Sequence, residues 1–198
     1  MKQKVFVDMD GVLANFGKKV NEIMSDPTIP TYFKKHPDEI DGVFRDLEPL
    51  QEAFESVVKL HKSNKYDLFI AKTAPWKNPS SFSDKRIWIK KHFGDIFEKK
   101  MFITHRKDLL LGDYLIDDRL ANGAKDFKGQ LIHFGWNYES KTWNDYKDWK
   151  SVLILMIFAY SILALVKNEA NPKTIRRIPP RIPICVLIFS KGNCCKTV

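Results

Sequence analysis

The stretch KVFVDMDGVLANF, residues 4–16, places two aspartates at the end of a short apolar run. Residues 4–7 have the composition of a buried strand, and Gly11 permits a turn after it because glycine adopts backbone angles that other residues resist. Side chains two residues apart in an extended chain point to the same side, so we expect Asp8 and Asp10 to face one place. Two carboxylates this close repel unless a metal ion or a shared proton intervenes. An ordinary acidic turn at a strand end is the alternative interpretation.

The length and charge of the chain fit one domain with an atypical end. The 198 residues suffice for a single core, and the formal net charge is +9. Residues 151–198 carry seven Lys/Arg against Glu169 alone, a net of +6, so the first 150 residues carry +3. A body with this charge needs no polyanion to explain it, and we expect no nucleic-acid polymer as partner.

The cysteines also separate the end of the chain from its body. All three, Cys185, Cys194 and Cys195, lie in the last fourteen residues. The body therefore lacks the residues for a disulfide or a thiolate metal site. The first residues, MKQKVFVDMD, contain no apolar signal core, which favours a cytoplasmic protein.

Short apolar runs alternate with helical patterns along the body. The other expected strands are residues 66–71, 101–104, 114–117 and 130–134. Helices are expected over residues 48–63 and 83–97, the second with Ser83 or Asp84 as its N-cap. This alternation predicts an α/β fold, with a parallel sheet covered by helices on both faces.

A longer polar interval, residues 15–65, separates the first two expected strands. Pro27, Pro30 and Pro37 prevent a single long helix there. We predict a small helical cap, inserted after the first strand and lying over the strand ends, where it can exclude water from a site. The alternative is an ordinary crossover with a long loop.

Polar residues follow four of the expected strands. They are Asp8 and Asp10, then residues 73–75, 105–107 and 117–119. Ligands of parallel α/β sheets bind beyond the carboxyl ends of the strands, so these groups should converge. Carboxylate oxygens suit Mg²⁺, a hydroxyl and a backbone N–H can hold phosphate oxygens, and a lysine can offset the charge of phosphoryl transfer. A carboxylate that is not needed for the metal can attack phosphorus.

These motifs resemble those of the haloacid-dehalogenase-like (HAD) phosphatases and, in detail, those of the 5'(3')-deoxyribonucleotidases. The similarity rests on DMDGVLANF (8–16), TAP (73–75), and Lys107 ten residues before Asp117 of IDDR. It extends over LEPL, KKHFGDIF and DYKDW and covers residues 4–150. The resemblance implies a three-layer Rossmann-like fold of the HAD type with a small cap.

The resemblance also implies roles for the aspartates. Asp8 would be the nucleophile and a metal ligand. Asp10 would be the general acid and base, with its backbone carbonyl also reaching the Mg²⁺. Asp118 would complete the metal site; Asp117 is the alternative ligand, because spacing cannot separate adjacent aspartates.

The remaining implied residues concern the substrate. Thr73 and the amide of Ala74 would bind the phosphate, and Lys107 would neutralise it and hold the nucleophile. Phe16 matches an aromatic residue of the family's base or sugar pocket, although its alternative role is in the core of the following helix.

Several other polar and aromatic residues are expected to have ordinary structural roles. We expect His105, Trp88 and Trp136 to be packing or surface residues, and Lys77 is a weaker candidate for a substrate contact. The lysine-rich segments KKVNEI and KRIWIKKHF are expected to be solvated helix faces.

The end of the chain changes character after the body. Residues 152–166 are almost wholly apolar but shorter than the roughly 20 residues that span a membrane. Three interpretations stay open: a marginal membrane anchor, a closing helix on the sheet, and an extension without selected function. The resemblance ends near residues 149–153, which favours the third, although Trp149 and residues 152–155 are expected to form a closing helix in any case.

The sequence thus predicts a phosphatase domain over residues 1–155 and an apolar, basic extension over 156–198. The expected reaction is Mg²⁺-dependent hydrolysis of nucleoside monophosphates, most simply deoxyribonucleotides, through an aspartyl-phosphate intermediate. Hydrolysis of another small phosphate ester and a non-catalytic membrane-associated scaffold are the alternatives. The substrate would be a small-molecule nucleotide, and homodimer formation is left open.

Overall fold

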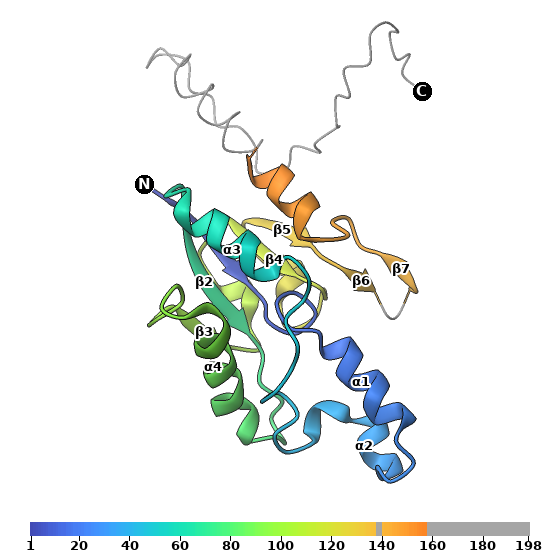
Figure 1. Ribbon diagram of the computed structural model, residues 1–198. Helices are drawn as coiled ribbons and strands as arrows, with labels where there is room; N and C mark the ends of the chain where they lie inside the picture. The colour runs from blue at the N-terminus through green and yellow to red at the C-terminus, as the bar shows by residue number, and fades with distance from the viewer. Residues whose placement is uncertain (138–139, 158–198) are drawn as a thin grey trace, which may run out of the picture.

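A five-stranded parallel sheet forms the centre of the molecule in the computed structural model, which describes residues 1–137 and 140–157 (Figure 1). The strand order is β3-β2-β1-β4-β5. The bounds are β1 Gln3–Val7, β2 Tyr66–Lys72, β3 Met101–Ile103, β4 Tyr114–Asp117 and β5 Gln130–His133. The α/β class and all five expected strands are confirmed.

The register of the sheet brings the polar strand ends together. At the carboxyl end of the central strand, Val7 pairs with Ile70 of β2 and with Ile116 of β4. The residues that follow these three positions therefore leave the sheet at the same edge. This edge is where ligands of parallel sheets are bound.

The two faces of the sheet are covered differently. Three helical segments pack against the face that carries Val5 and Val7: α3 (Ala53–Lys62), α4 (Ser80–Phe93) and residues 149–157. The other face, which carries Phe6, is covered among the described residues by connecting loops and two 3₁₀ helices, η2 Lys107–Leu109 and η3 Ala124–Asp126. The expected α-helices on this second face are absent from the described chain because the connections after β3 and β4 are short.

Helix α4 begins earlier than the sequence suggested. Its first residue is Ser80, so the expected N-cap at Ser83 or Asp84 is wrong. Asn78 accounts for the early start, because its Oδ1 accepts a hydrogen bond from the backbone N–H of Ser81 at 3.3 Å. Asp84 lies inside the helix and is buried.

The interval between β1 and β2 divides into two parts. Helices α1 (Phe16–Ser25) and α2 (Thr31–Lys35) and the 3₁₀ helix η1 (Pro37–Glu39) lie together beyond the carboxyl end of the sheet (Figure 1). The helix expected over 48–63 is shorter and starts at Ala53, where α3 turns back onto the sheet. Residues 16–47 thus have the position expected for a cap, and the domain limits themselves stay a prediction.

The last described helix closes the core. The Trp149 indole N–H donates to the backbone oxygen of Val12 at 2.8 Å, and the Tyr66 hydroxyl donates to that of Met156 at 2.6 Å. Val152 and Met156 are fully buried, so the expected closing helix is confirmed and its packing reaches one residue past 155. The three interpretations of the extension fall on residues 158–198, which lie outside the described residues. Within the part of the chain that the structure describes, no helix is long and apolar enough to cross a membrane.

A short hairpin precedes this helix. It consists of β6 (Trp136–Asn137) and β7 (Thr142–Trp143), which pair antiparallel beside the end of β5. The hairpin returns the chain to the carboxyl edge of the sheet, where the Phe134 and Tyr146 backbones form a bridge.

Candidate active site

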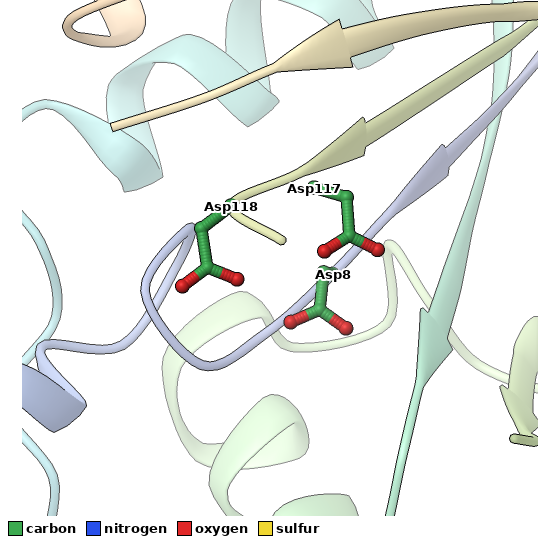
Figure 2. Close-up of side chains that lie close together, drawn as sticks. All are labelled: Asp8, Asp117 and Asp118. Atoms are coloured by element: carbon green, nitrogen blue, oxygen red, sulfur yellow. The ribbon is translucent and has the colours of Figure 1, made fainter. Parts of the chain in front are cut away.

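Three carboxylates meet where β1 and β4 end. Asp8 directly follows β1, Asp117 is the last residue of β4, and Asp118 comes next (Figure 2). One carboxylate oxygen from each lies within 4.8 Å of the others. The parallel pairing of β1 with β4 is sufficient to bring them together, because both strands end at the same edge of the sheet.

Lys107 lies between two of these carboxylates. Its Nζ donates to Asp8 Oδ1 at 2.6 Å and to Asp117 Oδ2 at 2.5 Å, and the side chain is buried. Burial alone would lower the pKa of Lys107, but the charges of Asp8 and Asp117 outweigh it and raise this pKa. We call these four residues, Asp8, Lys107, Asp117 and Asp118, the Lys107 cluster.

Asp117 and Asp118 differ in what their oxygens contact. Asp117 uses both: Oδ2 accepts from Lys107, and Oδ1 accepts from the backbone N–H of Arg119 at 3.0 Å. Asp118 Oδ1 is buried and accepts no hydrogen bond from the described residues. Asp118 therefore has the greater capacity left for a further ligand.

The electrostatics of the Lys107 cluster favour a bound cation. Burial and the charge of Asp8 raise the pKa of Asp117 to about 6. The same two causes raise the pKa of Asp118 well above its ordinary value. Among the described residues, Arg119 Nε is the nearest cationic atom to Asp118 Oδ1, at 4.0 Å, too far for a hydrogen bond. Carboxylates that resist ionisation together, one of them with a buried oxygen that accepts no hydrogen bond from these residues, form a donor set that fits a hard divalent cation.

Gly11 permits the close approach of Asp118 to the first loop. Its φ is +77°, a conformation that residues with a side chain rarely adopt. A Cβ atom at this position would lie 2.3 Å from Asp118 Oδ2. The glycine after the two aspartates thus serves both the turn and the carboxylate that packs on it.

Asp10 belongs to a second ionic group, which the sequence did not indicate. Its Oδ2 accepts from Lys72 Nζ at 3.0 Å and from Lys85 Nζ at 2.7 Å. Lys72 is 0% and Lys85 1% exposed. The expectation that the segment KRIWIKKHF is a solvated helix face is therefore wrong for Lys85. We call these three residues, Asp10, Lys72 and Lys85, the Asp10 cluster.

The two lysines determine the charge state of Asp10. Burial alone would raise the pKa of Asp10, but the positive charges of Lys72 and Lys85 and their hydrogen bonds hold it well below its usual value. Lys85 Nζ also donates to the backbone oxygen of Thr73 at 3.0 Å and lies 3.6 Å from the centroid of the Phe44 ring. The Asp10 cluster thus connects the first loop, the end of β2 and the cap.

A cavity of about 840 Å³ lies between the strand ends and the cap. Four predicted site residues line it: Asp10, Phe16, Thr73 and Asp118. The other four are buried and are not among the residues that line it: Asp8, Ala74, Lys107 and Asp117. Phe16 stacks on Phe44 with ring centroids 5.1 Å apart, so this aromatic pair forms part of the cap side of the cavity.

Residues that were expected to have ordinary roles divide into two groups. Trp88 is a core residue, and its indole N–H donates to the Leu47 backbone oxygen at 2.7 Å. His105 and Trp136 instead line the cavity. Lys77 does not line it; its Nζ lies 3.4 Å from Glu39 Oε1 within the cap.

Comparison with known proteins finds a similar fold and a matching family. A haloacid dehalogenase-like family hydrolase from Xanthomonas campestris has a similar fold, with a TM-score of 0.50 and 11% identity over 85% of this chain and 99% of that one. A family model described as "5' nucleotidase, deoxy (Pyrimidine), cytosolic type C protein" matches residues 26–161.

Two curated relatives lie in the same family. The "Putative 5'(3')-deoxyribonucleotidase" of Vibrio phage KVP40 is 36% identical over 152 residues, covering 77% of this chain and 83% of the relative. The cytosolic-type 5'(3')-deoxyribonucleotidase of Homo sapiens is 29% identical over 141 residues, covering 59% and 70%.

The chain has the fold of the HAD-like hydrolases, and its family match makes it a phosphomonoester hydrolase. Within that class the chain belongs to the 5'(3')-deoxyribonucleotidase family. The resemblance in the motifs and the expected enzyme class are both confirmed.

Proposed function

We propose that the protein hydrolyses deoxyribonucleoside monophosphates to nucleoside and phosphate, with Asp8 as nucleophile and Mg²⁺ as cofactor. The observation that carries the proposal is the position of Asp8, which shares Lys107 with Asp117 and lies beside Asp118 at the carboxyl edge of the sheet. A small cavity beneath a cap suits a small-molecule nucleotide better than a polymer.

The cation would be held by the carboxylates of Asp8 and Asp118 and by the backbone carbonyl of Asp10. Asp117, whose two oxygens already accept hydrogen bonds, would orient the others. When bound, Mg²⁺ supplies positive charge against the phosphate oxygens and against the mutual repulsion of the carboxylates.

The first chemical step would transfer the phosphoryl group to the protein. A carboxylate oxygen of Asp8 attacks phosphorus, the bond from phosphorus to the ester oxygen breaks, and Asp10 gives its proton to that oxygen, which releases the nucleoside. Thr73 and the N–H of Ala74 would hold the phosphate oxygens, and Lys107 would offset their charge. Phe16, stacked on Phe44, would contact the nucleoside.

The second step would return Asp8 to its resting state. Water attacks phosphorus and gives a proton to Asp10, and the bond between phosphorus and Asp8 breaks to release phosphate. Lys72 and Lys85 keep the empty site's Asp10 ionised. The negative charge of a bound phosphate ester opposes them, so Asp10 would take up from solvent, as the ester binds, the proton that it gives in the first step. The proton that Asp10 receives from water in the second step would return to solvent when phosphate leaves.

A substrate panel tests the proposal. Phosphate release is measured with deoxyribonucleoside and ribonucleoside 5'- and 3'-monophosphates, sugar phosphates and an aryl phosphate, each with Mg²⁺ and with excess chelator. We expect the highest kcat/KM for a deoxyribonucleotide and loss of turnover in chelator that added Mg²⁺ reverses. A sugar phosphate as the best substrate would contradict the nucleotide assignment, and full activity in chelator would contradict the metal.

A further inference from the structure

Asn144 follows the β6–β7 hairpin and connects two strand ends through its side chain. Its Nδ2 donates to the backbone oxygen of Asp118 at 3.1 Å and to that of Phe134 at 2.8 Å. Its own backbone N–H donates to the Gly135 oxygen at 2.9 Å. One residue from outside the sheet therefore fixes the chain just beyond β4 to the chain just beyond β5.

The peptide at Asp118 needs such a partner because the sheet ends one residue earlier. Asp117 is the last residue of β4, and its backbone oxygen still accepts from the Phe134 N–H at 2.8 Å. Asp118 lies past the strand, where the described neighbour that donates to its backbone oxygen is Asn144. The main chain that carries the Asp118 carboxylate is thus held by a side-chain amide instead of a strand.

Asp118 also experiences forces that would displace it. Its carboxylate lies among those of Asp8 and Asp117, so like charges push it outward whenever all three are ionised. On the other side it packs against Gly11, where there is no room for even a methyl group. Arg119 Nε attracts this carboxylate from 4.0 Å, too far for a hydrogen bond that would fix its direction. A fixed backbone is therefore the contact that holds the direction of the carboxylate.

We propose that Asn144 is a positioning residue for cation binding, which acts by fixing the Asp118 backbone so that the carboxylate faces Asp8. The inference rests on the divalent cation of the proposed function. It assigns no contact between Asn144 and the cation or the substrate. Residues that orient metal ligands in this way typically change metal affinity by about 10 to 100-fold when they are mutated.

Asn78 provides a matched control because it makes the same kind of contact elsewhere. Its Nδ2 donates to the backbone oxygens of Asp38 at 2.9 Å and Ile40 at 2.8 Å. These contacts join the start of α4 to the cap, and the side chain is 1% exposed. Loss of this amide should disturb the cap side of the cavity and leave the carboxylates in place.

The experiment measures Mg²⁺ binding to the metal-free full chain by isothermal titration calorimetry, and in parallel the KM for the best nucleotide. We expect Asn144→Ala to weaken Mg²⁺ binding by about 10-fold or more. Asn144→Asp has nearly the same shape but lacks the N–H donors, and it should weaken binding at least as much. Asn78→Ala should leave the Mg²⁺ affinity within about twofold and raise the nucleotide KM, since its contacts hold the cap.

The outcomes are distinct. The inference is overturned if both Asn144 variants bind Mg²⁺ as tightly as the wild type, or if Asn78→Ala weakens binding equally, because a general loss of order would then explain the effect. A wild type that binds no Mg²⁺ would overturn it as well. A wild type that binds Mg²⁺ but hydrolyses no nucleotide would contradict the proposed function alone, and the comparison of Asn144 with Asn78 would still decide this inference.

Discussion

The Lys107 cluster and the Asp10 cluster use the same two residue types in opposite ratios. In the Lys107 cluster one ammonium is shared between carboxylates, and three carboxylates with one lysine give a formal charge of −2. In the Asp10 cluster one carboxylate is shared between two lysines, which gives a formal charge of +1, and burial lowers the pKa of Lys72 well below its ordinary value. Asp8 and Asp10 are only two residues apart, yet Asp8 belongs to the negatively charged cluster and Asp10 to the positively charged one.

The opposite net charges of the two clusters match the two ions that meet in phosphoryl transfer, a divalent cation and a phosphate anion. The Lys107 cluster has more carboxylates than its one lysine can neutralise, and the Asp10 cluster lies beside Thr73, the proposed phosphate-binding residue. Buried ion pairs by themselves rarely stabilise a fold, because the cost of removing charges from water offsets their attraction. Two unbalanced clusters side by side are therefore better explained by what they bind than by stability.

The largest expected effect comes from removing the proposed nucleophile, Asp8, from the Lys107 cluster. Asp8→Asn should lower kcat by about 10⁴-fold or more, because an amide can neither attack phosphorus nor supply an anionic oxygen to the cation. Phosphate release with the best nucleotide measures it, and circular dichroism confirms the fold.

Asp113→Asn is the matched control for this variant. Asp113 immediately precedes β4 at the opposite edge of the sheet, where its Oδ2 accepts from the Lys4 backbone N–H at 2.7 Å. It should retain activity within about twofold. Near wild-type turnover by Asp8→Asn would show that another residue is the nucleophile.

The next effect concerns stability and pH in the negative cluster. The folded-state pKa of Asp117 is raised to about 6 from 3.8, so between these values the folded protein keeps a proton that the unfolded chain releases. Stability of the metal-free protein therefore falls as pH rises through this window, by up to about 1.4 kcal/mol per pH unit for this group, and Asp118 acts in the same direction. A cation that replaces the proton removes this loss.

Thermal denaturation with Mg²⁺ and with chelator tests this argument. We expect Mg²⁺ to raise Tm more at pH 8 than at pH 5, where protons already neutralise part of the cluster. Asp118→Asn should reduce the shift at pH 8. An equal shift at both pH values would mean that Mg²⁺ does not bind at these carboxylates.

The negative cluster could be predicted from the sequence, and the positive one was missed for a physical reason. Asp8, Lys107 and Asp118 were found because they follow apolar runs whose parallel pairing puts their ends at one edge. Lysine is almost never fully buried, so Lys85 was assigned to a solvated helix face and Lys72 was not singled out. Both positions carried a signal of burial, however.

That signal is the regular spacing of buried residues along the strand and along the helix. Lys72 is two residues beyond Ile70 on β2 and points to the same face, while Lys85 lies one turn before Trp88 and Ile89 of α4. Lys72 precedes the TAP segment (73–75) and Lys85 follows it, and each is in phase with buried residues. A lysine in such a position predicts a buried partner. Asn144 had no comparable pattern, because the hairpin that places it is too short to show a period.

The smallest expected effect tests the contact between Gly11, in the loop after β1, and the Lys107 cluster. Gly11 and Gly94 both have positive φ, +77° and +59°, but a Cβ at Gly94 would meet nothing within 4 Å, whereas one at Gly11 would lie 2.3 Å from Asp118 Oδ2. Alanine at either position should cost about 1–3 kcal/mol, because φ is positive at both and Gly94, with ψ −125°, lies outside the left-handed helical region. Only Gly11→Ala should also displace the Asp118 carboxylate, so it should raise the Mg²⁺ concentration for half-maximal activity, while Gly94→Ala leaves that concentration unchanged.

Urea denaturation measures the backbone strain that the two variants share, and Mg²⁺ titration of phosphate release measures the difference between them. If both variants lost stability equally and kept the wild-type Mg²⁺ dependence, the packing of Gly11 on Asp118 would have no part in forming the cation site, and the role of Gly11 would be limited to its turn.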